Sequence, residues 1–254
     1  MSQDSSVGFS APTSLGAPCD GTTGHGTTGH ATLAHHGLVM ALRQRTRGLH
    51  AEAERSGIIR DVLRGAASRY GYALLLRTLL PAYQALEAGL EWHRDSPLLA
   101  ALARREVYRA ATIAADLDLL AGPAWPDTLP LLKSAQHYAD RVADAAAGDG
   151  ARLLAHAYTR FLGDLSGGRV MAARLASSLA TLPGALRFNE FPDIADLAAF
   201  KSAYLAALDH AGSLVSDQQA IVEEAAYAFS CNIAVSEEVQ QSAGVSATTT
   251  PDLI

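Results

Sequence analysis

The sequence predicts an all-α protein that folds as one compact multi-helix domain over residues 37–243. From Leu38 onward, apolar residues recur at spacings of three and four, which is the periodicity of an amphipathic helix. Alanine, leucine, arginine and glutamate dominate this stretch, and all four favour helices. No run alternates valine, isoleucine or threonine with polar residues, and no phosphate-binding glycine loop or serine nucleophile elbow is present. Helices packed around a shared apolar core are therefore expected.

The boundaries of the predicted helices follow from residues that start or stop helices. Ser96 is a good N-cap, and Pro97 suits the first helical position. Four further pairs mark helix ends or junctions: Gly122-Pro123, Asp149-Gly150, Pro183-Gly184 and Pro192-Asp193. We expect eight helices, over residues 38–54, 57–65, 68–94, 97–120, 127–147, 150–180, 193–210 and 214–242.

The two ends of the chain have a different composition from the helical part. Residues 1–36 are rich in glycine, serine, threonine and proline, and they contain the repeat GTTGHGTTGH. Such a segment buries too little apolar area to offset its ordering entropy, so we expect a disordered tail. Its histidines can bind transition metals weakly, or they are incidental polar residues. Residues 244–254 are short and polar, and a flexible C-terminal tail is expected there.

Charge and hydropathy exclude several classes of protein. The net charge of −6 lacks the basic excess that nucleic acids or anionic membranes require. No stretch reaches the roughly 18 apolar residues of a membrane-spanning helix. The N-terminus does not resemble a secretion signal, and Cys19 and Cys231 lie far apart without a paired spacing. We therefore expect a cytoplasmic monomer that binds neither nucleic acid nor membrane.

The segment LRQRTRGLHAEAE, residues 42–54, places four polar residues on one face of a helix. Arg43, Arg47, His50 and Glu54 are spaced by four, three and four. A histidine is a natural axial ligand for haem iron, and an acceptor such as Glu54 would fix the ring orientation. The arginines could pair with haem propionates. The alternative is an amphipathic helix whose polar stripe faces water.

The segment HAYTRFLGDLSGGRV, residues 156–170, holds three glycines inside a strongly helical stretch. Each internal glycine costs about 1 kcal/mol relative to alanine. Gly163, Gly167 and Gly168 therefore indicate a kink or a close backbone approach, for which a flat macrocycle is one candidate. Tight packing between two helices is the other. Asp164 lies one turn from Arg160, which permits an ion pair, and it could anchor ordered water above a bound metal.

Together, LRQRTRGLHAEAE and AHAYTRFLGDLSGG resemble the haem oxygenase family. The resemblance covers roughly residues 38–242 and includes the weaker matches YQALEAGLE, DLDLLAGPAW and FSCNIAVSEEV. It implies that haem is sandwiched between a proximal helix and a kinked distal helix. It also implies cleavage of haem to biliverdin, carbon monoxide and ferrous iron, with O2 as the oxidant.

The resemblance assigns roles to individual residues. His50 matches the proximal iron ligand, and Glu54 matches its hydrogen-bonding partner. Asp164 matches the distal acid that holds a water network above the haem. The residues that tie this acid into its network are Tyr83, Tyr138, Arg160 and Asn232. The remaining haem contacts are the distal glycines Gly163, Gly167 and Gly168, the propionate contacts Arg43, Arg47, Tyr158 and Lys201, and the pocket aromatic Phe229.

One position departs from the family pattern, and two alternatives stay open. Leu205 stands where better-known members have an arginine that clamps a propionate, although we still expect cleavage at the alpha-meso carbon. The sequence has no flavin or nicotinamide motif, so electrons are expected from a separate ferredoxin or flavoprotein reductase. A haem carrier or sensor on the same fold would need a broken distal network. A helical enzyme of another class, such as a thiaminase-like one, would need Cys231 as a nucleophile.

Overall fold

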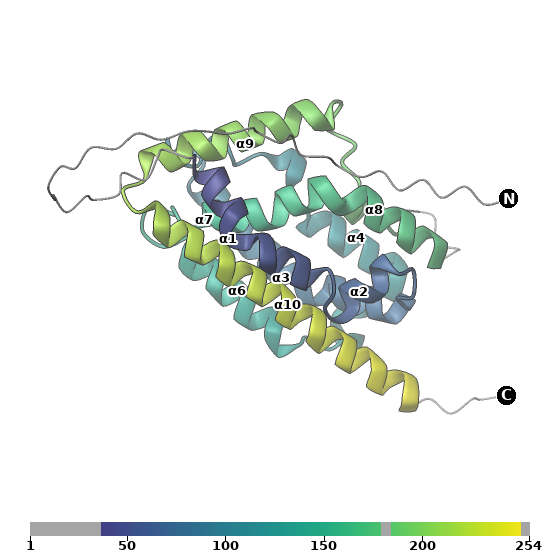
Figure 1. Ribbon diagram of the computed structural model, residues 1–254. Helices are drawn as coiled ribbons and strands as arrows, with labels where there is room; N and C mark the ends of the chain where they lie inside the picture. Colours follow the sequence, from purple (N-terminus) through teal and green to yellow (C-terminus); the bar gives the residue numbers. More distant parts are fainter. Residues whose placement is uncertain (1–36, 179–183, 250–254) are drawn as a thin grey trace, which may run out of the picture. The chain divides into compact units, whose positions relative to one another are not determined.

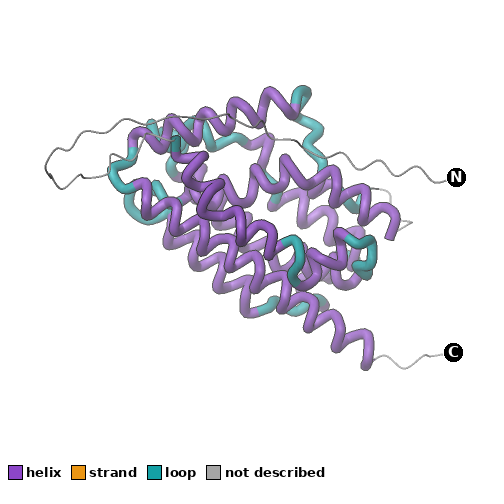
Figure 2. The backbone as a smooth tube through the Cα atoms, in the orientation of Figure 1, coloured by secondary structure: helices purple, strands orange, loops and turns teal. Residues whose placement is uncertain are grey.

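The computed structural model describes residues 37–178 and 184–249, and every regular element in these ranges is a helix (Figure 2). The all-α prediction is confirmed, whereas the expected N-terminal tail lies outside the described residues. The α-helices are α1 (Leu38–Ala53), α2 (Gly57–Leu63), α3 (Arg69–Trp92), α4 (Ala110–Ala121), α5 (Trp125–Thr128), α6 (Lys133–Ala145), α7 (Leu153–Ala157), α8 (Gly163–Ser178), α9 (Leu197–Leu214) and α10 (Gln218–Thr249). Three short turns accompany them: η1 (Arg105–Val107), the π-helical η2 (Tyr158–Leu162) and η3 (Arg187–Asn189).

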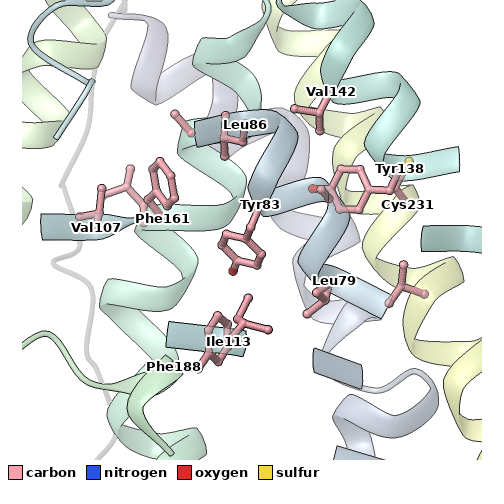
Figure 3. Packing of buried hydrophobic residues seen from close by; sticks show 14 of the residues in the cluster. Leu79, Tyr83, Leu86, Val107, Ile113, Tyr138, Val142, Phe161, Phe188 and Cys231 are labelled. Atoms are coloured by element: carbon pink, nitrogen blue, oxygen red, sulfur yellow. The ribbon is translucent and has the colours of Figure 1, made fainter. Parts of the chain in front are cut away.

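Helix α3 forms the centre of the apolar core. It packs against α4, α6 and α10, and most of its residues are buried. Figure 3 shows Tyr83 of α3 close to Phe161, Ile113 and Phe188 from three other elements. Fully burying one such large apolar side chain stabilises the fold by about 1.5–3 kcal/mol. The core therefore fixes α3 and holds the side chain of Tyr83 in place.

Helix α10 lies against α1, α2, α3, α6 and α7 (Figure 1). Its closest approach is to the start of α2, where Gly57 has a φ of +47°. A Cβ at Gly57 would lie 2.2 Å from the carbonyl of Ser236, so only glycine fits. The hydroxyl of Ser236 accepts from the backbone N–H of Ile59 at 3.0 Å and donates to the carbonyl of Ser56 at 2.9 Å.

Two helices begin where an acidic side chain from another helix caps them. The backbone N–H of Val39 in α1 donates to Asp209 of α9 at 2.8 Å. The N–H groups of Arg109 and Ala110 at the start of α4 donate to Glu87 of α3, at 2.5 and 2.8 Å. A carboxylate at a helix N-terminus satisfies free N–H groups and interacts favourably with the helix dipole.

The predicted helix over residues 97–120 is wrong in its first half, because α4 begins only at Ala110. Arg109 explains the difference. Its guanidinium donates to the backbone carbonyls of Tyr108, Glu106 and Glu190, which holds the preceding backbone out of a helix. The segment contains good helix formers, so these tertiary contacts override local propensity.

Three other helix boundaries also differ from the prediction. The helix expected over 127–147 begins at Lys133, because Pro130 lacks an N–H and disfavours helix at the preceding residue. Helix α9 starts at Leu197 instead of 193, since the Asp196 side chain accepts from the backbone N–H groups two and three residues on. The helix expected over 214–242 is α10, which runs from Gln218 to Thr249, and the next proline after it is Pro251.

The described residues belong to one compact unit. None of the helices in residues 37–178 and 184–249 is long and apolar enough to span a bilayer.

Candidate active site

The polar stripe on α1 is exposed, as its spacing predicts. Arg43, Arg47, His50 and Glu54 are all exposed, and the His50 side chain retains 58% of its accessible surface. The Nδ1 atom of His50 lies 3.7 Å from a carboxylate oxygen of Glu54. A carboxylate beside Nδ1 favours a proton on that nitrogen, which leaves Nε2 to bind a metal.

Helix α10 brings an aromatic ring to His50. The rings of His50 and Phe229 have centroids 5.8 Å apart and are tilted by 58°. Phe229 is buried, and Asn232 lies three residues further along the same helix. Asn232 accepts a hydrogen bond from Arg160 of the η2 turn. One face of α10 therefore contacts both His50 and Arg160 of the glycine-containing segment, residues 156–170.

Asp164 and three of the four residues predicted around it form a continuous hydrogen-bonded group. The hydroxyl of Tyr83 donates to Asp164 Oδ2 at 2.6 Å. The Nε and Nη2 atoms of Arg160 donate to Tyr83 Oη at 3.0 and 2.7 Å. Arg160 Nη2 also lies 3.5 Å from Asp164 Oδ1, and Arg160 Nη1 donates to Asn232 Oδ1. Tyr138 is fully buried, and its hydroxyl interacts with the Asn232 side chain without forming a hydrogen bond of normal geometry to a described residue.

The surroundings of Asp164 shift its protonation. Burial raises the pKa of this carboxyl, while the charge of Arg160, the Tyr83 hydrogen bond and the charge of Arg109 oppose the rise. A carboxyl with a raised pKa keeps its proton to higher pH than an exposed aspartate does. Such a group is better suited than an exposed aspartate to donate protons through water.

The predicted kink of the second segment has a local structural cause. Helices α7 and α8 are joined by the π-helical turn η2, which spans Tyr158–Leu162 and ends directly before Gly163. Single π-helical turns inside α-helices occur often at functional sites. The helix expected over residues 150–180 is therefore three consecutive elements, with Arg160 on the middle one.

The three glycines serve two different purposes. A Cβ built at Gly163 or Gly167 meets no atom within 4 Å, so both glycines border open space. A Cβ at Gly168 would lie 3.0 Å from the carbonyl oxygen of Asn189. Gly168 therefore packs closely against η3, and its assignment as a haem contact stays a prediction. Close packing thus accounts for Gly168, whereas the open space beside Gly163 and Gly167 leaves room for a ligand.

The other predicted contacts are not joined to the α1 stripe. Lys201 and Tyr158 are each half-buried, on α9 and η2. Within the described part of the chain, no hydrogen bond or ion pair connects either residue to Arg43 or Arg47. Leu205 packs against the apolar core. The position on α9 where better-known family members have a propionate-binding arginine is therefore apolar in this chain.

Arg109 is the main site residue that the sequence did not indicate. It is buried, its charge acts on Asp164, and its guanidinium carbon lies 4.3 Å from the Phe191 ring centroid. No local motif marks it, because its partners come from distant parts of the chain. A second unpredicted group consists of His156 and Glu224, which form a buried pair.

Two further observations concern metals and nucleophiles. Cys231 is buried, and burial raises the pKa of its thiol to about 11. A thiol of this kind stays protonated at neutral pH, which argues against a nucleophilic cysteine. Within residues 37–178 and 184–249, no cluster of three or more His, Cys, Asp or Glu side chains could hold a metal ion.

Comparisons with known proteins agree on one family. A sequence model of the family described as "Heme oxygenase" matches residues 36–238. "Heme oxygenase 1" of Homo sapiens is 34% identical over 205 residues, which are 79% of this chain and 71% of the relative. "Heme oxygenase 2" of Synechocystis sp. is 35% identical over 210 residues, which are 80% of this chain and 83% of the relative.

Solved structures show the same likeness. The crystal structure of heme oxygenase-1 from Synechocystis sp. in complex with heme superposes with a TM-score of 0.76 at 30% identity. The superposition covers 84% of this chain and 98% of that chain. Heme oxygenase-2 from Synechocystis sp., in complex with heme and NO, gives a TM-score of 0.77 at 33% identity and covers 83% and 88% of the two chains.

Proposed function

The chain belongs to the haem oxygenase family of haem-degrading enzymes, and from this we propose that it opens haem at the alpha-meso carbon. The products would be biliverdin, carbon monoxide and ferrous iron. The observation that carries the proposal is the arrangement of two polar groups around one face of α10. His50 contacts Phe229, and the Asp164 network is bonded to Asn232 on the same helix.

The residues fit a flat, iron-containing macrocycle. Gly163 and Gly167 border open space, which lets a planar ligand approach the α8 backbone. His50 offers an exposed imidazole. Its Nδ1 faces Glu54, so its Nε2 would be the nitrogen that binds iron, and Phe229 supplies an apolar ring beside it. A neutral histidine with a carboxylate on its other nitrogen is a common axial ligand for haem.

The cationic residues would hold the carboxylate edge of the ligand. Arg47 and Arg43 are exposed one and two turns before His50, respectively. We propose that they bind the propionates together with Lys201, and that Tyr158 contacts the same region. Guanidinium groups pair well with carboxylates because their geometries match. Leu205 cannot take part in such a pair, so this chain would rely more on the α1 arginines.

Haem would supply the redox-active iron that activates O2, and it is also the substrate whose ring is opened. The role of Asp164 would be to hold ordered water above the haem and to deliver protons through it. Tyr83 and Arg160 fix the carboxyl of Asp164 by direct contacts. The η2 turn would orient this group toward one edge of the ring. A weakly donating histidine ligand suits ring opening better than a thiolate would.

The proposed enzyme needs electrons from outside the chain. We propose a separate ferredoxin or flavoprotein reductase as the donor, and a monomeric, cytoplasmic enzyme. The alternative of a haem carrier or sensor requires an incomplete distal network. The direct contacts among Tyr83, Arg160, Asp164 and Asn232 argue against it.

The test is turnover of bound haem by the purified protein. Haem is added in equal amount, followed by a ferredoxin–reductase pair and O2, and the absorption spectrum is recorded with time. We expect the Soret band to decline while a biliverdin band grows, and the isolated pigment to be the alpha isomer. A Soret band that persists unchanged under reductant and O2 would indicate a carrier or sensor.

A further inference from the structure

A buried ion cluster surrounds Glu224 of α10, outside the site described above. The Glu224 side chain is 1% exposed, and Arg141 donates two hydrogen bonds to it, at 2.8 and 2.5 Å. Arg152 lies 3.5 Å from the same carboxylate. Burial alone would raise the pKa of Glu224, but the bonds from His156 and Arg141 outweigh it and lower the pKa to about 2. Glu224 is therefore a carboxylate at neutral pH.

This carboxylate sets the protonation of His156. The Nε2 atom of His156 lies 3.0 Å from Glu224 Oε1, and the imidazole is fully buried. A carboxylate can only accept, so Nε2 must carry the proton. Burial lowers the pKa of His156, which keeps the ring neutral. Its Nδ1 is thus a bare acceptor, and it has no hydrogen-bond partner among the described residues.

Two other buried polar atoms near His156 also lack a well-formed hydrogen bond to residues 37–178 and 184–249. They are the hydroxyls of Tyr138 and Thr159. The ring centroids of Tyr138 and His156 are 5.9 Å apart. Thr159 follows His156 by three residues, so the two side chains are neighbours along the helical segment. The three atoms therefore belong to neighbouring residues on α6 and the α7–η2 segment.

We propose that one ordered internal water bridges His156 Nδ1, Tyr138 Oη and Thr159 Oγ1. The hydrogen-bonding types of the three atoms suit a single water. Tyr138 donates to it, the water donates to His156 Nδ1, and the threonine hydroxyl either donates or accepts. Buried waters typically make about three hydrogen bonds to polar groups that are otherwise unsatisfied. An unsatisfied buried group is costly, so the site favours hydration.

The bridging water would connect Glu224 to the distal network through bonds of fixed direction. Asn232 Oδ1 accepts from Arg160, so its NH2 group is the part that donates toward Tyr138 Oη. Arg160 is then the central donor of two chains. One chain runs through Tyr83 to Asp164, and the other runs through Asn232, Tyr138, the water and His156 to Glu224.

This connection makes His156 and Glu224 positioning residues for the reaction. They would fix the orientation of Tyr138, and through Asn232 the direction in which Arg160 faces Asp164. The effect on catalysis rests on the proposed function, whereas the water site itself does not. A surface pocket lined by Arg141, Arg152 and Glu224 lies next to the cluster, which gives solvent access to its outer end.

The first experiment is a high-resolution crystal structure of the full chain without haem. We expect an ordered water within hydrogen-bonding distance of all three atoms, about 2.7–3.2 Å. Direct bonds among the three side chains, or three atoms without a shared water, would overturn the proposal. This result does not depend on whether the protein degrades haem.

The second experiment measures the midpoint pH of the acid–alkaline spectral transition of the ferric haem complex. Thr159→Val and Glu224→Gln should shift the midpoint by about 0.3–1 pH unit, the scale of one lost hydrogen bond. Thr159→Ser keeps the hydroxyl and should match the wild type. The control is Thr78→Val, because the buried Thr78 hydroxyl is already satisfied by the carbonyl of Leu74 at 2.7 Å.

The outcomes of the second experiment separate the two claims. Wild-type midpoints in both Thr159→Val and Glu224→Gln would disprove the positioning role, even if the water is seen. A protein that binds no haem would contradict the proposed function, and the water site would still be decided by the haem-free crystal structure.

Discussion

The hydroxyl of Tyr83 donates a 2.6 Å hydrogen bond to Asp164, and the two residues lie on different helices, α3 and α8. Tyr83 is fully buried in the core, so its position is fixed by packing. Arg160 donates to the same tyrosine oxygen, which directs the tyrosine proton toward the carboxylate. The orientation of Asp164 thus depends on the central core helix as well as on its own helix.

Replacing Tyr83 by Phe should slow haem cleavage while haem still binds. The lost bond is worth about 1–2 kcal/mol, so we expect a decrease of roughly 5- to 30-fold in the single-turnover rate. The bond lowers the pKa of Asp164, so its loss should move the alkaline limb of the pH–rate profile to higher pH. Tyr204→Phe is the matched control, since the buried Tyr204 hydroxyl donates to the carbonyl of Leu102 and not to the Asp164 network. An unchanged rate and profile would contradict the assigned role.

Replacing His50 by Ala should weaken haem binding and abolish turnover, because the iron would lose its protein ligand. Added imidazole should restore part of the activity by occupying the same position. The measurements are a haem titration followed at the Soret band and the rate of biliverdin formation. His137→Ala, which removes an exposed histidine bonded to Tyr227, should behave like the wild type. Normal turnover without imidazole in the His50 variant would remove the proximal assignment.

Replacing Asp164 by Ala should leave haem bound but reduce the biliverdin yield. A positioned acid or base typically contributes about 100- to 10,000-fold to a reaction rate, so we expect the rate of haem cleavage to fall by a factor in this range. The yield of biliverdin per haem, measured in a single turnover, is the direct readout. An undiminished yield would mean that ordered water is held by other groups.

The glycines of α8 should separate haem binding from stability. Gly167→Ala places a Cβ in open space, so the haem-free protein should gain up to about 1 kcal/mol of helix stability. The same Cβ would obstruct a flat ligand, and haem affinity should fall. Gly168→Ala should show the opposite pattern, with a lower melting temperature caused by the close contact to Asn189. Equal haem affinities in the Gly167 variant and the wild type would count against haem at this face.

Glu224 should make the fold sensitive to acid. Its pKa is about 2 in the folded protein, below the ordinary value of 4.5. The unfolded chain therefore binds the proton first as pH falls. The stabilisation, on the order of 2 kcal/mol, is fully present above about pH 4.5 and is lost as pH falls toward 2. Urea unfolding at a series of pH values should show this slope, and Glu224→Gln should flatten it. An identical slope in both proteins would disprove the ion cluster's contribution.

The helical fold and the two chemistry-bearing segments could be predicted from sequence because their signals are local. The apolar periodicity predicted the helix that α1 forms, and the glycines indicated an irregularity close to the start of α8. The start of α4 could not be predicted, because Glu87 and the bonds of Arg109 act across the fold. The π-helical turn has no sequence signature, so the sequence indicated the Arg160–Asp164 pair but not the turn that carries Arg160. The role of Gly168 depended on η3, which lies about twenty residues further along the chain.

The most direct test of the central claim is a crystal structure of the protein loaded with haem. We expect the iron to be bound by His50 Nε2, with the backbone at Gly163 and Gly167 against the opposite face of the ring. The Asp164 carboxyl should lie on that same opposite side, still bonded to Tyr83. Iron bound by another residue, or haem seated away from these glycines, would contradict the account.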